Sequence, residues 1–465
     1  MAYPLDPSPE DMRAMGEGAL AYVVDFLRRR PDAPASAFEG AAETARRFRM
    51  SPPEDGDEFP PLIDLVETIA EHSSDNAGPG FLAYIPGGGL YASSLAELLS
   101  TTIDRYVNLW GEAPVAAQVE NNVVRWLCDL FDYPPESRGV LTSGGSMANF
   151  SAIVSARKAK LPENFLSGAL YVSEHAHASV MKAAMLAGFP TRNVRIVATD
   201  PSLRMDVDAL RRRILEDREG DLLPFGVVAS AGTTNTGAID PLDDIARVAA
   251  DEGLWMHVDA AYGGFFQLTE RGRARFRGIE RADSITLDPH KGMFLPYGTG
   301  ALVVRNGRAL REAHFVGAAY LQDLAADADI PNFAEYSAEL SRDFRGLRVW
   351  FPLWLHGVSA FRLALDEKLD LTEVLYDGLK SDPLLELPWA PDLTVVPFRL
   401  RDGDDAANRR LLEAINASKR VFLSSTVIDG RFTIRACILS HRTHRDRIDE
   451  CIEIVRRAAA SVASE

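Results

Sequence analysis

Hydrophobic and polar residues alternate with a helical period in residues 8–30, SPEDMRAMGEGALAYVVDFLRRR. The segment starts with a serine and an acidic turn and ends in three arginines. This order of charge suits a helix dipole, so we predict an amphipathic helix. Residues 31–60 are rich in proline and charge and predict a segment that runs over the surface. Residues 62–130 are mostly helical in pattern, interrupted by the loop YIPGGGLY.

The pattern changes between residues 138 and 305, where short β-rich runs appear: GVLTS, GALYVS, VRIVAT, FGVVASAG, LWMHVDAAY, DSITLD and GALVVR. Most of them alternate with helical stretches at 146–160, 177–188, 206–218 and 241–252. Alternating helices and apolar strands predict a mostly parallel sheet covered on both faces. Residues 348–465 combine a helix at 350–368, three candidate strands and a closing helix, and predict a small α+β domain.

A glycine turn follows the first of these strands, in GVLTSGGSMANF. Free backbone N–H groups at the start of the next helix, near Ser146, would make an anion site together with serine hydroxyls. The turn lacks the lysine of a GxxxxGK[ST] nucleotide loop. A plain tight turn with a serine cap explains the same residues.

Other chemically active side chains also stand where predicted strands end. Asp259, in LWMHVDAAYGG, is either a helix cap or a buried charge that needs a cationic partner. His175 and His177 could form a metal pair, but no further histidine or cysteine motif completes a zinc site, and capping or core roles compete. Lys291 follows the buried-looking strand in SITLDPHKG, an unusual place for a strongly hydrated ammonium.

These signals mean more together than singly. Ligands of open α/β sheets bind outside the carboxyl ends of the strands, where all of these residues are predicted to gather. Pyridoxal 5'-phosphate (PLP) needs an anion site for its phosphate, a carboxylate for its protonated ring nitrogen and a lysine for its aldehyde. The combination therefore predicts a PLP enzyme with no metal.

Seven stretches of the chain resemble the group II PLP-dependent amino acid decarboxylases, which include aromatic-L-amino-acid, glutamate and histidine decarboxylases. They are FLAYIPGGGLYASSLAELL, TSGGSMAN, YVSEHAHASV, SAGTTNTGAID, HVDAAYGG, DPHKG and SRDFRGLRVW, in the order of the family. The resemblance implies the α/β PLP-dependent transferase type I fold, a mostly parallel sheet flanked by helices. It also implies an N-terminal helical dimerisation segment (1–90), a large PLP-binding domain (91–347) and a small C-terminal α+β domain (348–465).

The resemblance also assigns roles to single residues. Lys291 would form the Schiff base with the cofactor, Asp259 would pair with the ring nitrogen, and His177 would stack over the ring. The other residues assigned to the cofactor are Gly145 and Ser146 at the phosphate, Thr233 at the ring substituents, Ala261 on the face opposite His177, and His290 near the reacting face. When the bond to the substrate carboxylate breaks, the protonated cofactor ring would stabilise the electron pair that remains.

The family carries a mobile loop with a Tyr-Leu dipeptide, matched here by Tyr320 in GAAYLQDLAADADIPNF. The resemblance makes Tyr320 the proton donor on a lid, whereas composition alone would favour a surface tyrosine. Relatives that release an aldehyde usually have phenylalanine at this point. Tyr320 therefore predicts simple decarboxylation to the amine and CO2.

Two glycines depart from the family pattern. Gly292 replaces a tryptophan after the lysine, and we expect it to open space near the Schiff base. Gly87 replaces the threonine of animal aromatic decarboxylases, so a hydroxyl near the substrate is missing.

The substrate is predicted to be an aromatic L-amino acid, such as tyrosine, DOPA or tryptophan. Ser341 precedes the RxFR segment and matches the choice that plant relatives make for phenolic substrates. Phe81, Tyr84 and Trp110 could line the substrate pocket with Gly87, although core packing explains these aromatics equally well.

Three alternatives remain open at this stage. The chain could decarboxylate glutamate, histidine or diaminobutyrate. It could be an aminotransferase or another PLP lyase of the same fold, with Arg435 binding the substrate carboxylate. It could also be a scaffold that binds no cofactor.

Composition and charge limit the classes of partner and the compartment that we expect for this protein. The net charge of −17 argues against nucleic acid and against anionic membranes. Three cysteines form no CxxC pair, no signal peptide is recognisable, and no apolar run is long enough for a membrane span, so we expect a cytoplasmic protein. The family is dimeric, and the apolar face of 8–30 agrees with a homodimer that has active sites at the subunit boundary.

Overall fold

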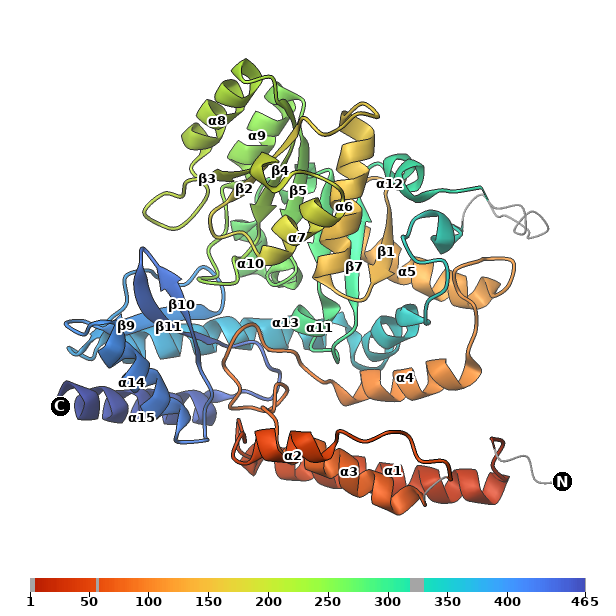
Figure 1. Cartoon of the computed structure of the whole chain (residues 1–465), viewed down its shortest axis with the longest axis vertical. Coiled ribbons are helices and arrows are strands. Elements are labelled where there is room, and N and C mark those ends of the chain that lie inside the picture. Colours follow the sequence, from red (N-terminus) through yellow and green to blue (C-terminus); the bar gives the residue numbers. More distant parts are fainter. Residues whose placement is uncertain (1–4, 56–57, 318–329, 465) are drawn as a thin grey trace.

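A seven-stranded sheet forms the centre of the computed structural model, which describes residues 5–55, 58–317 and 330–464 (Figure 1). Its strand order is β1-β7-β6-β5-β4-β2-β3. β7 runs antiparallel to β1 and β6, and the other neighbours are parallel. The strands are β1 (Arg138–Thr142), β2 (Gly168–Ser173), β3 (Val194–Val197), β4 (Leu223–Ser230), β5 (Trp255–Asp259), β6 (Ser284–Leu287) and β7 (Gly300–Val304). The predicted mostly parallel sheet is confirmed.

In most strands, successive residues enter two different hydrophobic cores. In β1, Val140 packs on one face of the sheet and Leu141 on the other; in β2, Leu170 and Tyr171 divide in the same way. Side chains alternate across a strand, so both faces of this sheet are buried. This is why the strands read as continuous apolar runs in the sequence.

Helices cover both faces of the sheet (Figure 1). They are α5 (Pro114–Leu130), α6 (Gly145–Lys160), α7 (Ala178–Leu186), α8 (Val207–Glu219), α9 (Leu242–Glu252), α10 (Glu270–Arg275) and α12 (Gly307–His314). The short helix α11 (Pro289–Gly292) follows β6. The loops that lead from each strand to the next helix therefore carry the polar residues that the sequence analysis found after the strands.

The C-terminal part has an antiparallel sheet of its own, in the order β10-β11-β9-β8. It is formed by β8 (Leu385–Glu386), β9 (Val395–Leu400), β10 (Ser424–Ile428) and β11 (Arg431–Cys437), with α14 (Asp405–Asn416) and α15 (Arg445–Ala463). These elements share a separate hydrophobic core. The predicted α+β arrangement is thus confirmed. The expected helix at 350–368 is longer, because α13 (Arg345–Lys380) continues through a kink at Gly357.

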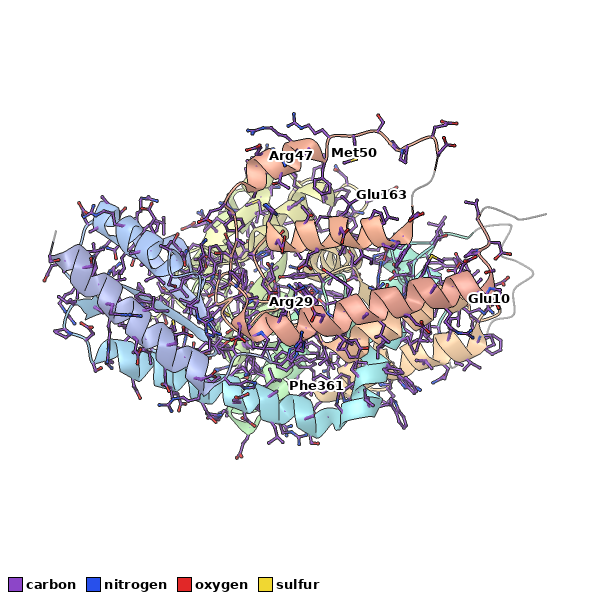
Figure 2. All side chains as sticks on the ribbon, turned by 90° about the horizontal axis from the view of Figure 1, so that it is seen from below. Glu10, Arg29, Arg47, Met50, Glu163 and Phe361 are labelled. Atoms are coloured by element: carbon purple, nitrogen blue, oxygen red, sulfur yellow. The ribbon has the colours of Figure 1, made fainter. Side chains whose placement is uncertain are left out.

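The N-terminal helices α1 (Pro9–Arg29), α2 (Ala41–Arg47) and α3 (Phe59–Glu71) lie along one side of the molecule (Figures 1 and 2). The predicted N-terminal helix is α1, and Ser8 caps it by accepting the N–H of Asp11. None of the residues in these three helices, all of which the structure describes, is buried. In the described ranges, no helix combines the length and apolar character needed to cross a membrane.

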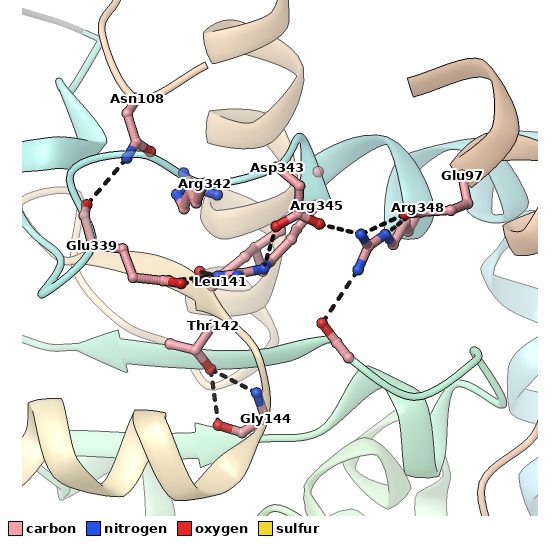
Figure 3. Close-up of polar contacts among 12 residues, drawn as sticks. Glu97, Asn108, Leu141, Thr142, Gly144, Glu339, Arg342, Asp343, Arg345 and Arg348 are labelled. Carbon is pink, nitrogen blue, oxygen red and sulfur yellow. Dashed lines mark hydrogen bonds and ion pairs between the residues drawn. The ribbon is translucent and has the colours of Figure 1, made fainter. Parts of the chain in front are cut away.

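Three arginines tie the start of α13 to the large sheet (Figure 3). Arg342 pairs with Glu120 of α5, and both side chains are fully buried. Arg345 binds Glu339 and also donates to the carbonyl of Leu141 at the end of β1. Arg348 pairs with Glu97 of α4 (Tyr91–Ile103) and donates to the carbonyl of Gly298. Because buried cations need such partners, this network fixes the start of α13 beside the glycine turn.

Candidate active site

A cavity of about 250 Å³ lies at the carboxyl ends of β2, β4, β5 and β6, beside the turn after β1. The structure brings eight predicted residues together around it: Gly145, Ser146, His177, Thr233, Asp259, Ala261, His290 and Lys291. It adds Asn149, Ser179 and Asp288, which the sequence reasoning did not select. Segments separated by more than a hundred residues therefore converge on one small volume.

The glycine turn leads directly into α6. Among the described residues, no side chain caps this helix, so the alternative of a serine-capped turn is wrong. A side chain at Gly145 would begin 3.0 Å from Asp288 Oδ2 and 3.1 Å from Ala261 Cβ, so even a methyl group would crowd the start of the helix. Uncapped N–H groups and the positive end of the dipole make this a site for an anion.

Asp259 ends β5 and is only 8% exposed. Its Oδ1 accepts the N–H of Ala261 at 3.1 Å, and its Oδ2 accepts a hydrogen from Asn149 Nδ2 at 2.9 Å. Asp259 does not cap the next helix, since that helical turn begins at Gly264 and none of the described side chains caps it, so the cap alternative is wrong. The carboxylate shapes the following turn and also lines the cavity as a buried negative charge.

Lys291 and Asp288 form an ion pair across one turn of α11, with 2.9 Å between Nζ and Oδ2. Burial acts to lower the pKa of Lys291, but the charge and the hydrogen bond of Asp288 outweigh it, and the pKa is raised. Asp288 Oδ1 is buried and has no hydrogen-bond partner in the described part of the chain. The sequence signal that could have revealed Asp288 is its position three residues before the lysine, directly after a buried strand.

His290 is the residue before Lys291, and burial lowers its pKa although Asp288 acts to raise it. Its Nδ1 lies 2.7 Å from the carbonyl oxygen of Thr299. A carbonyl only accepts, so the proton of the neutral ring is on Nδ1. Nε2 lies 3.6 Å from Asp288 Oδ2.

His177 caps α7 and lines the cavity at the same time. Its Nδ1 accepts the backbone N–H of Ser179 at 3.2 Å and lies 2.7 Å from the hydroxyl of Ser179. The capping role and the site role that competed in the sequence are therefore compatible. Within the described residues, no three histidine, cysteine or acidic side chains are grouped as a metal site requires.

The five predicted substrate-pocket residues, all in the described part of the chain, do not line this cavity. Phe81 packs against Phe422, Tyr84 is 61% exposed, Trp110 joins a small cluster with Phe344, and Ser341 lies on the surface. Gly87 borders a separate cavity of about 870 Å³ next to the N-terminal segment. Tyr320 lies outside the described residues.

Gly292 does not open space beside Lys291, contrary to our expectation. A Cβ at this position would lie 2.7 Å from Phe265 Cβ, so the Phe265 side chain already fills the volume. Arg435 is buried and donates to the carbonyls of Tyr84 and Asn235 and to the hydroxyl of Ser424. These contacts tie β11 to the loop that contains Tyr84.

His257 lies two residues before Asp259 on β5, and its buried imidazole should make the stability of the fold depend on pH. Burial lowers its pKa to about 4 although Asp259 acts to raise it. Above the unfolded pKa of about 6.5, neither state binds the proton. Below it the unfolded chain binds a proton that the folded chain refuses, so this contribution to stability is lost as the pH falls from about 6.5 to 4, by about 1.4 kcal/mol per pH unit.

We expect urea unfolding at pH 7, 6 and 5 to show this slope as a difference between the wild type and His257→Gln. The difference cancels the other histidines, which titrate in both proteins. Parallel stability curves for the two proteins over this pH range would contradict the buried neutral imidazole.

Comparison with known proteins identifies the family. The family model described as the pyridoxal-dependent decarboxylase conserved domain matches residues 43–401. The chain therefore belongs to the pyridoxal-dependent decarboxylases. It is a PLP-dependent amino acid decarboxylase, and thus a carboxy-lyase.

Individual relatives extend over the whole chain. An aromatic-L-amino-acid decarboxylase of Bacillus atrophaeus is 32% identical over 100% of this chain and 98% of its own. An L-2,4-diaminobutyrate decarboxylase of Rhizobium meliloti is 30% identical over 97% and 92%. The crystal structure of Oryza sativa TDC with PLP and tryptamine superposes with a TM-score of 0.93 at 25% identity, covering 99% of both chains. The predicted fold class is confirmed.

The residues of the cavity fit PLP. The open helix start at Gly145 suits its phosphate, and the buried carboxylate of Asp259 suits a protonated ring nitrogen. Lys291 offers an amine, and Asp288 Oδ1, which has no partner among the described residues, offers an acceptor at the same place.

Proposed function

We propose that this decarboxylase converts an aromatic L-amino acid to its amine and CO2. The observation that carries the proposal is the match over the full chain to an aromatic-L-amino-acid decarboxylase. Ser341 matches the position where plant relatives discriminate among aromatic substrates, but it lies on the surface away from the cavity and so adds no support for a phenolic ring. The diaminobutyrate relative makes a diamino acid the second candidate.

The experiment is amine formation from L-Tyr, L-DOPA, L-Trp, L-Phe, L-Glu, L-His and L-2,4-diaminobutyrate, with CO2 measured in parallel. No 2-oxo acid is added, because an aminotransferase would need one as acceptor. We expect an aromatic amino acid to give the highest kcat/KM, with one CO2 per amine. Preference for L-2,4-diaminobutyrate or L-Glu, or product only when a 2-oxo acid is present, would refute the proposal.

We further propose roles for the residues around the cavity. PLP supplies a covalent attachment for the amino group and a ring that accepts the electrons of the breaking bond. Lys291 holds the cofactor, and Asp288 Oδ2, at 2.9 Å, accepts the proton that the ammonium must lose before its nitrogen can react.

The remaining roles concern the ring and the phosphate. Asp259 would keep a proton on the ring nitrogen by charge pairing, and His177 and Ala261, which line the same cavity, would hold the ring between them. The N–H groups of Gly145 and Ser146 bind the phosphate. Thr233 contacts the ring substituents, and the buried His290 beside Lys291 limits water at the reacting side.

Tyr320 is proposed as the proton donor to the product carbon. We expect Tyr320→Phe to lower amine formation by about 10²-fold or more, the usual contribution of a positioned acid, because the ring keeps its shape but loses its hydroxyl proton. The cofactor absorbance should stay as in the wild type. Amine yield and aldehyde yield are measured together.

Tyr336→Phe is the matched control, since Tyr336 is a half-buried tyrosine outside the cavity. It should leave the amine yield unchanged. An unchanged yield in Tyr320→Phe would remove this residue from the mechanism.

We propose a cytoplasmic homodimer formed through the N-terminal segment 1–90, which precedes a large domain (91–347) and a small domain (348–465). Support comes from apolar side chains that α1 and α3 leave exposed: Met12, Leu20, Val24, Leu62, Leu65, Val66 and Ile69; α4, at the start of the large domain, adds Leu98 and Leu99. Exposed apolar side chains of this kind are what a partner subunit would cover. Cys128, Cys437 and Cys451 are buried and free, as suits a reducing compartment.

Sedimentation of the wild type should give the mass of two chains, about 102 kDa from 51.0 kDa each. The double variant Leu65→Lys/Ile69→Lys on α3 should sediment as a monomer and lose turnover. A wild-type monomer with full turnover would contradict the interface.

A further inference from the structure

Asn149, in the second turn of α6, lies buried beneath the cavity and uses the full bonding capacity of its amide. Nδ2 donates to Asp259 Oδ2 and to Ser179 Oγ, both at 2.9 Å. Oδ1 accepts from Thr286 Oγ1 at 2.7 Å and contacts His257 Nε2 at 3.0 Å. One side chain therefore joins four elements at the floor of the site.

The amide can adopt only one orientation. The carboxylate of Asp259 accepts hydrogen bonds and cannot donate them, so the amide nitrogen must face it. Oδ1 then faces His257, whose proton must be on Nε2. The opposite side of that ring agrees, since the indole N–H of Trp255 donates to Ser284 Oγ at 2.8 Å, and the Ser284 hydroxyl is left to donate to His257 Nδ1 at 2.8 Å.

The bonds continue from Asn149 to the histidine of the cavity. Ser179 Oγ accepts the Asn149 hydrogen, and its own hydrogen is directed to His177 Nδ1 at 2.7 Å. The backbone N–H of Ser179 points to the same nitrogen, so the proton of the neutral His177 ring is on Nε2. Donor and acceptor are thus assigned for every hydrogen bond in the series that runs from Trp255 through Ser284, His257, Asn149 and Ser179 to His177.

We propose that Asn149 is a positioning residue that sets two sides of the cofactor ring together, Asp259 at its edge directly and His177 at its face through Ser179. The inference rests on the proposed roles of Asp259 and His177. Its physical basis is the buried network: rotating or removing the amide would leave several buried polar groups without partners. The two contacts with the ring are then not independent of each other.

The test is the dissociation constant of PLP, measured by titrating apoprotein. We expect Asn149→Ala to weaken binding by about 10-fold or more, since both links are lost, and Ser179→Ala by about 3-fold, since only the hydroxyl link between Asn149 and His177 is lost while the backbone N–H of Ser179 still donates to His177 Nδ1. Asn149→Ser, which keeps a hydroxyl donor, is measured alongside and should fall between the two.

Asn408→Ala is the matched control. Asn408 is equally buried and also makes hydrogen bonds through both ends of its amide, to the backbone of Leu400, Gly403 and Asp404 in the small C-terminal sheet region. Its loss should lower the melting temperature and leave PLP affinity unchanged. Equal weakening in Asn408→Ala would show a general loss of packing and would overturn the proposal.

A spectroscopic readout separates positioning from mere occupancy. The visible circular dichroism of bound PLP, divided by its absorbance, depends on the orientation of the ring in the protein. We expect this ratio to fall by about half in Asn149→Ala, because the ring loses its fixed edge and face, and to stay constant in Asn408→Ala. Wild-type affinity and wild-type dichroism in Asn149→Ala and Asn149→Ser would overturn the proposal.

The variants Asp259→Asn and His177→Ala separate a failure of the proposed cofactor contacts from a failure of the role proposed for Asn149. If neither variant weakens PLP, the proposed roles of Asp259 and His177 fail. If both weaken it while the Asn149 and Ser179 variants bind as the wild type does, only the role of Asn149 fails.

Discussion

Replacing Lys291 by alanine is expected to lower the rate of CO2 release by about 10³-fold or more, because no other described residue that lines the cavity carries an amine to attach the cofactor. The change also leaves Asp288 as a buried carboxylate without its cation. Breaking such a pair costs about 3–5 kcal/mol, so the apoprotein should unfold at lower urea concentration. Single-turnover CO2 release and urea unfolding measure the two effects.

Two further variants separate chemistry from stability. Lys291→Arg keeps a cation beside Asp288 and should recover stability without recovering turnover, since a guanidinium stays protonated. Lys368→Met removes another buried lysine, one that binds Glu367 and the carbonyl of Thr443. It should lower stability and keep turnover per bound cofactor. Turnover retained by Lys291→Arg would contradict the role of the lysine.

Replacing Asp259 by asparagine is expected to lower kcat by about 10²–10³-fold, the range seen when one preorganised electrostatic group is lost. The new amide has the shape of the carboxylate but no charge to hold a proton on the ring nitrogen. The PLP dissociation constant should rise in parallel. Steady-state kinetics at saturating PLP separate the loss of rate from the loss of binding.

Asp217→Asn serves as the control for this substitution. Asp217 is a buried carboxylate that pairs with Arg195 at 2.7 Å, away from the cavity. Its replacement should destabilise the fold and spare kcat. A kcat for Asp259→Asn within a few-fold of the wild type would mean that the ring nitrogen needs no carboxylate here.

Local sequence patterns predicted the large sheet well because its strands and helices are short, regular and buried. The helical stretches expected at 146–160 and 206–218 appear as α6 (Gly145–Lys160) and α8 (Val207–Glu219). The predicted helix at 350–368 already contained Pro352 and Gly357; α13 was underestimated at its two ends, since it begins at Arg345 and continues to Lys380. Pro352 is tolerated near the start of the helix, and Gly357 forms the kink.

The candidate site was only partly predictable. Charged residues at strand ends, such as Asp259 and Lys291, can be found from pattern and resemblance. Asn149 escaped because a buried asparagine in a helix has no sequence signature; only the fold brings it to Asp259. Gly292 was misjudged because Phe265, 27 residues earlier in the chain, occupies the space.

The attachment of PLP to Lys291 is tested most directly by reducing the holoprotein with borohydride and mapping the modified peptide by mass spectrometry. The account predicts a pyridoxyl mass on the peptide that contains DPHKG, with Lys291 as the modified residue, and no label in Lys291→Arg. A label on another lysine, or none in a protein that releases CO2, would contradict it.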